Sequence, residues 1–139
     1  MSRWVKQTTA GTTSIATTST TDEYIVVAKT GKVTAAKLNS LSGLAAHDTN
    51  YLTFAITNLG AAASGTAALL AATDANTTKS TGGSLLTANV VRSLTLSSTA
   101  ADLLVTEGDV LRLRATSAAT LAGAVTRPMW ELTIKTVQR

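Results

Sequence analysis

The stretches Val105–Leu113 (VTEGDVLRL) and Met129–Val137 (MWELTIKTV) decide the fold. In the second stretch, Trp130, Leu132 and Ile134 alternate with polar residues. A period of two over five or more residues predicts a strand with one buried and one exposed face. The first stretch places a glycine between two acidic residues, a turn pattern, and continues into a strand of the same alternating kind. Both stretches therefore predict antiparallel sheet.

The rest of the chain predicts further short strands separated by polar turns. Runs rich in β-branched and aromatic residues recur with turn residues between them, although one alanine-rich run also suits a helix. About eight strands at this spacing predict an all-β, antiparallel two-sheet β-sandwich, and the jelly roll is the natural eight-strand version. The expected strands are Glu23–Ala28, Val33–Leu38, Tyr51–Thr57, Thr66–Ala72 (the alanine-rich run), Asn89–Ser97, Val110–Thr116, Thr120–Ala124 and Met129–Val137.

Residues 1–21 differ in composition from the rest. Between Gln7 and Thr21 most positions are Thr or Ser, which offer little apolar surface to offset the ordering of the backbone. We therefore expect an extended Thr/Ser-rich N-terminal arm over residues 1–21 and a β-sandwich domain over residues 22–139. The arm would be either a free tail or a strap that lies on its own domain or on a neighbour, with Trp4 as its large anchor. No apolar run typical of a secretory signal follows the start, which predicts synthesis in a cytoplasm.

The composition limits the classes of partner. Charged residues make up 14% of the 139 residues, and 12 bases against 8 acids give a net charge of +4. The bases stand singly, whereas a nucleic-acid groove is expected to show clusters of them. No window is apolar and long enough to span a membrane. We therefore expect neither nucleic acid nor a membrane as partner, and the absence of cysteine excludes disulfides and thiolate chemistry.

Candidate catalytic and metal-binding groups are few. His47 is the only histidine, and the adjacent Asp48 does not give it a nucleophile. The pairs Asp48 with Asn50 and Asp74 with Asn76 have a calcium-like spacing, but the fuller acidic loop pattern is missing and Asx turns explain them better. We expect no catalytic, cofactor or metal site, and we do not expect an enzyme.

The remaining candidate residues belong to contact surfaces. Arg112 and Arg114 lie two apart in one strand and so share a face, where guanidinium groups suit carboxylates across an interface or decorate a solvated sheet. Arg92 falls in phase with apolar neighbours, which marks a bulge or aims a charge at an interface. The candidate residues for a capsid or subunit interface are Arg3, Trp4, Lys6, Ile15, Arg92, Arg112 and Arg114.

Residues 22–137 as a whole resemble the small β-sandwich head proteins of tailed phages, the capsid decoration or cement proteins. The likeness lies in the order of EYIVVA, YLTFAITNLG, NVVRSLTLS, VTEGDVLRLRAT and MWELTIKTV along the chain, and mainly in the second and fourth of these. It implies a protein on the outer surface of the capsid, commonly a homotrimer, that bridges major capsid protein subunits. It also implies an extended terminal arm that reaches the capsid.

The expected function is therefore that of a virion structural protein that decorates and stabilises a phage capsid. The expected location is the outer surface of the virion, after synthesis in the host cytoplasm. Two alternatives stay open at this point. One is another virion component such as a tail, neck or fibre-base protein, and the other is a β-sandwich module that binds carbohydrate or a host surface.

Overall fold

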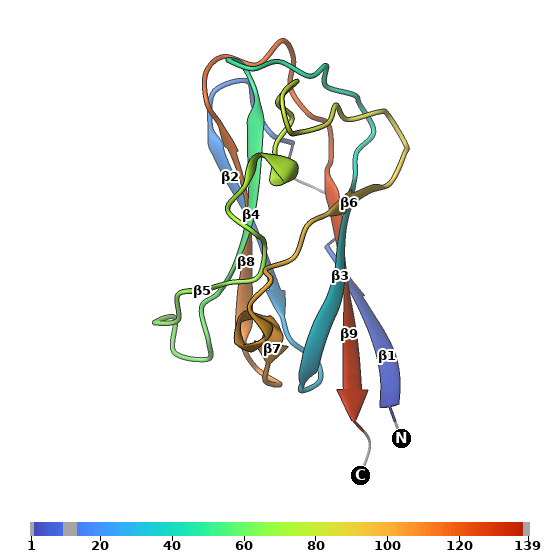
Figure 1. Cartoon of the computed structure of the whole chain (residues 1–139), viewed down its shortest axis with the longest axis vertical. Helices are drawn as coiled ribbons and strands as arrows, with labels where there is room; N and C mark the ends of the chain where they lie inside the picture. Colours follow the sequence, from blue (N-terminus) through green and yellow to red (C-terminus); the bar gives the residue numbers. More distant parts are fainter. Residues whose placement is uncertain (1, 10–13, 138–139) are drawn as a thin grey trace.

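The computed structural model describes residues 2–9 and 14–137 of the chain (Figure 1). Every pairing between its strands is antiparallel. The all-β class predicted from the sequence is therefore confirmed. The described elements are β1 Ser2–Thr8, β2 Thr20–Val26, β3 Gly31–Asn39, β4 Leu52–Asn58, β5 Ala67–Ala68, the 3-10 helix η1 Asp74–Asn76, β6 Arg92–Leu94, the 3-10 helix η2 Ala100–Leu103, β7 Leu104–Val105, β8 Val110–Ser117 and β9 Met129–Val137.

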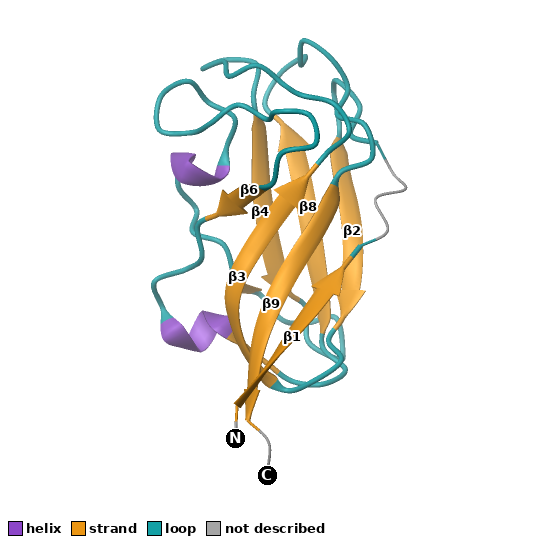
Figure 2. Cartoon of the chain, turned by 90° about the vertical axis from the view of Figure 1, so that its right-hand side faces the viewer, coloured by secondary structure: helices purple, strands orange, loops and turns teal. Residues whose placement is uncertain are grey.

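The strands lie in two facing sheets with the connectivity of a jelly roll (Figure 2). The five-stranded sheet has the order β1-β9-β3-β6, with β7 paired to β3, and the four-stranded sheet has the order β2-β8-β4-β5. If the two-residue β7 is set aside and the other eight strands are renumbered, the orders become 1-8-3-6 and 2-7-4-5. This is the strand order of the jelly roll. The predicted two-sheet sandwich of jelly-roll type is confirmed.

The core lies between the two sheets and follows the period-two alternation of the sequence. Trp130, Leu132 and Ile134 of β9 are each at most 2% exposed. Phe54 of β4 meets Trp130 edge to face across the sandwich, with ring centres 5.8 Å apart and planes at 82°. Aromatic pairs favour this arrangement, which adds about 0.5–1.5 kcal/mol to the burial of their area. The central strands of the two sheets are thus held by the residues that the sequence placed inside.

The N-terminal segment is part of the sandwich, which corrects the expected division at residue 22. All seven residues of β1 pair with β9, and β2 already begins at Thr20. Ile15 is 1% exposed and exchanges two backbone hydrogen bonds with Val125. A segment with little apolar surface is ordered here because β9 satisfies its backbone donors and acceptors. The expected arm also included residues 1 and 10–13, which lie outside the described residues.

One side chain joins the edges of the two sheets. Gln7 of β1 donates from Nε2 to the Val26 carbonyl at 2.9 Å and accepts at Oε1 from the Ala28 amide at 3.1 Å. Strands β1 and β2 are edge strands of opposite sheets, so this amide pairs two backbone groups at the end of β2. The contact ties β1 to the rest of the domain.

Three expected strands are shorter than the sequence suggested or are absent. β5 keeps only two residues of the expected Thr66–Ala72, and β6 keeps only three of Asn89–Ser97. The expected strand Thr120–Ala124 is a loop. The first and third of these segments are rich in alanine, which is depleted in strands.

The long loops gather at one end of the sandwich, as Figure 1 shows. They are segments 40–51, 77–91 and 118–128. Ser2 and Val137 pair at the opposite end of the five-stranded sheet. The chain therefore offers three kinds of surface, namely two outer sheet faces and one loop end. No helix among the described residues has the length and apolar character that crossing a membrane requires.

Candidate functional surfaces

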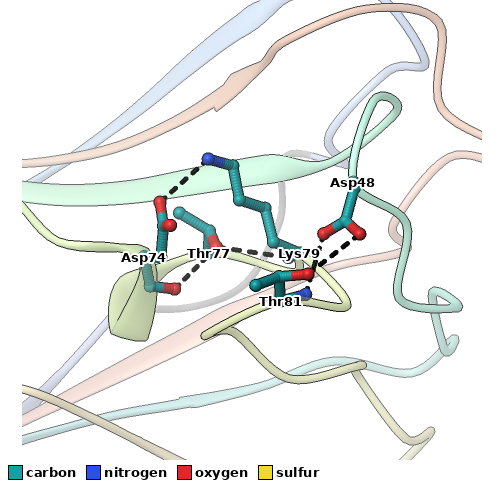
Figure 3. Close-up of polar contacts among 5 residues, drawn as sticks. All are labelled: Asp48, Asp74, Thr77, Lys79 and Thr81. Carbon is teal, nitrogen blue, oxygen red and sulfur yellow. Dashed lines mark hydrogen bonds and ion pairs between the residues drawn. The ribbon is translucent and has the colours of Figure 1, made fainter.

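A small polar cluster ties two segments of the loop end together (Figure 3). The Asp48 carboxylate accepts from the amide and the hydroxyl of Thr81 at 2.8 and 3.1 Å. Lys79 donates to Asp74 at 2.9 Å, and its ammonium lies 4.8 Å from the centre of the Tyr51 ring. The hydrogen bond from the Thr81 amide lowers the pKa of Asp48, and the one to Asp74 raises the pKa of Lys79. These bonds fix the shape of the loops.

The two calcium-like pairs of the sequence do not form a shared set of ligands. The carboxylates of Asp48 and Asp74 are engaged in the polar cluster. Asn76 is 1% exposed, and its amide nitrogen donates to the carbonyls of Ala71 and Thr95 at 2.7 and 2.8 Å. Its oxygen accepts from the Thr95 amide at 2.7 Å, so Asn76 joins two backbone segments. Nowhere in residues 2–9 and 14–137 do three His, Cys, Asp or Glu side chains come together.

His47 caps a turn. Its Nδ1 accepts from the backbone amides of Thr49 and Asn50 at 3.0 and 2.9 Å, and the residue is exposed. An imidazole nitrogen that accepts two amide hydrogens replaces a backbone carbonyl in holding the loop. His47 therefore has a structural part in its loop.

Arg92 points into the molecule and holds the loop end. Its guanidinium donates to the carbonyls of Ser84, Ala75 and Thr77 at 2.9, 3.0 and 2.6 Å, and it lies 5.4 Å from the centre of the Phe54 ring. Burial lowers the pKa of this half-buried group. The pairing of β6 with β3 has no register shift, so the expected bulge is absent. Arg92 does not share a face with Arg112 and Arg114, because β6 and β8 belong to different sheets.

Arg112 and Arg114 share the outer face of the four-stranded sheet, as expected, but they differ in their contacts. Arg114 donates from Nε and Nη2 to the two carboxylate oxygens of Asp22 at 2.7 and 2.9 Å. Arg112 lies opposite Tyr24, which is 57% exposed, and its Nε is buried without a hydrogen-bond partner among the described residues. The guanidinium of Arg114 is therefore engaged by a carboxylate of its own chain.

The other candidate residues lie in or near β1. Arg3, Trp4 and Lys6 are strand residues with exposed side chains. Ile15 packs in the core of its own domain. Its candidacy as an interface residue is therefore corrected, because a side chain that is 1% exposed has no surface left for a partner.

The outer face of the five-stranded sheet gathers lysines from three strands. The register puts Trp4, Lys135 and Lys32 in one row across β1, β9 and β3, and Glu131 and Lys37 lie opposite each other in a second row. Their chain neighbours on β9 are buried, so these side chains point outward. We call this surface the lysine face, and its residues are Trp4, Lys6, Lys32, Lys37, Glu131 and Lys135.

The lysine face carries four lysines and one glutamate. Glu131 lies 3.8 Å from the ammonium of Lys6. The ammonium of Lys135 lies 5.5 Å from the centre of the Trp4 ring, which is 62% exposed. Sequence reasoning had named Trp4 and Lys6 but had missed the face, because the lysines stand singly along the chain. The available signal covered only Lys37 and Lys135, which occupy polar positions of the predicted strands Val33–Leu38 and Met129–Val137.

Two hollows border the lysine face. One has a volume of about 240 Å³ and is lined by Lys37, Val91 and Met129 among others. The second has a volume of about 440 Å³, and Lys135 and Leu104 line it. Val91, Met129 and Leu104 are all exposed apolar residues. The lysine face is thus bordered by apolar side chains at two of its margins.

The described residues define an all-β jelly-roll domain with two open sheet faces, one of them rich in lysine. No family model matches the sequence, and no curated protein matches it. Among solved structures, the crystal structure of a serine protease of Aeromonas sobria matches with 16% identity and a TM-score of 0.42. The match covers 99% of this chain and 27% of the protease chain, so this chain spans about a quarter of that protein's length. At this TM-score the likeness carries no argument about activity.

Proposed function

We propose that the protein is a virion structural protein that decorates a phage capsid and stabilises it by bridging major capsid protein subunits on the outer surface. The observation that carries the proposal is the jelly-roll connectivity, which viral capsid proteins use. The two stretches that bear most of the resemblance to decoration proteins, YLTFAITNLG and VTEGDVLRLRAT, supply the neighbouring strands β4 and β8. Most of the resemblance therefore lies in one pair of neighbouring strands.

The physical demands of decoration suit these surfaces. Weak identical contacts repeated over a closed shell add up by avidity, so no single deep site is needed. A charged fraction of 14% keeps the cost of desolvation low when such surfaces meet a partner. A homotrimer would place three equivalent faces on one position of the shell and would cover sheet edges that otherwise invite uncontrolled pairing. We include the homotrimer in the proposal.

The test uses expanded heads, prepared without this protein, of the phage that encodes it. Purified protein should bind these heads saturably and raise the temperature at which they open, whereas precursor shells should not bind it. Light scattering should give a mass near three times 14.2 kDa. Heads that neither bind the protein nor gain stability would contradict decoration. A monomer that binds heads would overturn the trimer alone.

A carbohydrate or host-surface module is the second candidate, and one groove favours it. The groove has a volume of about 300 Å³, lies beside β4 and is lined by Tyr51, Ala55, Ala72, Asp74 and Lys79 among others. An aromatic ring with charged neighbours suits contact with a sugar, and lectin domains also use the jelly roll. A defined hit on a glycan array, lost on Tyr51→Ala, would support this candidate and count against decoration.

A tail, neck or fibre-base protein is the remaining alternative. Its copy number in purified virions would be far below that of the shell protein, and its rings would have another symmetry. Quantitative mass spectrometry of virions separates this alternative from decoration, because a decoration protein should approach the copy number of the shell protein.

A further inference from the structure

We propose that the lysine face is the docking surface of this protein and that its partner there is an acidic surface of a folded protein. The inference rests on the proposed function, in which that partner is the outside of the shell. It adds the face that docks and the chemistry that recognises it. It also moves the expected contact away from the two arginines of β8.

The two outer sheet faces differ in how their charges are matched. On the four-stranded sheet, Asp22 holds Arg114 through two hydrogen bonds, and Arg112 is the one outward cation of its strand β8 without an ion pair among the described residues. On the lysine face, no carboxylate of the described residues forms an ion pair with Lys32, Lys37 or Lys135. Lys32 and Lys135 lie directly opposite each other on strands about 5 Å apart, so these two like charges repel each other. Carboxylates of a partner would relieve that repulsion, which makes the lysine face the more favourable side for an acidic surface.

Trp4 gives the lysine face an apolar contact. Its side chain is 62% exposed although it belongs to a regular strand. Tryptophan is enriched among the interface residues that contribute most to affinity. The hollows with Val91, Met129 and Leu104 lie at the margins of the same face. Charges that steer the encounter and an aromatic anchor that is covered on docking are thus present together.

The geometry favours a protein over nucleic acid or a membrane. Nucleic-acid surfaces usually combine basic side chains with several aromatic rings on which bases stack. Here Trp4 is the single aromatic residue of the face, and the ammonium of Lys135 already lies over its ring. Between the lysines stand small side chains, including Ala35 and Thr133. Among the described residues, the exposed apolar side chains Val91, Met129 and Leu104 lie at the margins of this face, whereas insertion into lipid requires apolar side chains in its middle.

The experiment compares two double variants that change the net charge equally. Lys32→Glu with Lys135→Glu reverses two charges of the lysine face. Lys29→Glu with Arg127→Glu reverses two exposed charges outside it. Binding of each protein to expanded heads that lack it is measured by co-sedimentation over a range of salt concentrations. Duplex DNA of mixed sequence and phosphatidylserine vesicles are tested in parallel at the same salt.

We expect the face variant to bind heads at least about tenfold more weakly than the wild type, with a weaker dependence on salt. The control variant should stay within about twofold of the wild type. Trp4→Ala should lose roughly 30-fold, mainly through faster dissociation. DNA and vesicles should retain little protein.

Each other outcome has a distinct meaning. If the wild type binds heads and the two double variants bind them equally, decoration stands and the lysine face is wrong. If the wild type does not bind heads but binds DNA or vesicles through the lysine face, both the proposal of decoration and the proposal of an acidic protein partner are wrong. If the wild type binds none of the three, both proposals are overturned.

Discussion

Asp22 and Arg114 lie opposite each other on β2 and β8 and are joined by two parallel hydrogen bonds of 2.7 and 2.9 Å. The bond from Arg114 holds the pKa of Asp22 below its ordinary value and raises the pKa of Arg114. Because β2 is an edge strand, this pair fastens the border of the four-stranded sheet. Arg114, a candidate for contact with a partner, instead stabilises its own sheet.

The Asp22 pair predicts a stability difference that depends on pH. A carboxyl whose pKa is lower in the folded than in the unfolded chain stabilises the fold above its unfolded value of about 3.9, and this contribution is lost as the pH falls through the folded value. Asp22→Asn should therefore lower the free energy of unfolding by about 0.5–1 kcal/mol at neutral pH and by almost nothing near pH 2. Urea denaturation at both pH values measures the difference. A difference of equal size at acid pH would show that charge plays no part.

The hydrogen bonds of Arg92 predict that the stability of the loop end depends on its guanidinium. Arg92→Ala leaves three loop carbonyls without their donor and should cost roughly 2–3 kcal/mol in urea denaturation. Amide hydrogen exchange should accelerate in residues 77–84 before it does in the central strands. Arg92→Lys is the matched variant, because it keeps the charge but not the planar fork. Full stability in the lysine variant would show that the fork is not needed.

The sequence predicted what depends on a strand's own side chains. The alternation of Trp130, Leu132 and Ile134 gave the buried face of β9, and the glycine turn is present with Gly108 at a φ of +93°. The N-terminal strand was not predicted because its order comes from backbone bonds to β9, which is a property of the partner strand. Composition shows how much apolar surface a segment has, but not whether another strand lies beside it and pairs with it.

The candidate surfaces depend even more on pairing. The in-phase position of Arg92 predicted a bulge or a contact at an interface, whereas its acceptors are loop carbonyls that no sequence pattern marks. The lysine face requires Lys6, Lys32 and Lys135 to be neighbours, although they come from the first, third and last strands. Only the jelly-roll connectivity brings these strands together, and a scattered set of bases in the sequence thereby becomes one charged surface.

The two tryptophans predict opposite responses to truncation. Trp130→Ala removes a ring that is 2% exposed and should cost about 3–5 kcal/mol of stability. Trp4→Ala removes a ring that is 62% exposed and should change stability by at most about 0.5 kcal/mol. Urea denaturation followed by circular dichroism measures both without relying on tryptophan fluorescence. A large loss on Trp4→Ala would mean that this ring supports the fold and is not free for a partner.

Removal of β1 should destabilise the five-stranded sheet. A free arm could be deleted without loss, whereas β1 pairs all seven of its residues with β9. Deleting residues 2–8 should lower the free energy of unfolding by at least roughly 3 kcal/mol, since several backbone hydrogen bonds at about 0.5–1.5 kcal/mol each are lost. The deletion also turns β9 into a long exposed edge, which invites pairing between molecules. Light scattering should therefore show mass that rises with protein concentration beyond any trimer. Thr8→Ala keeps the β1 backbone and should neither lower the free energy of unfolding nor raise the mass. A deletion variant with unchanged stability would show that the segment is a free arm.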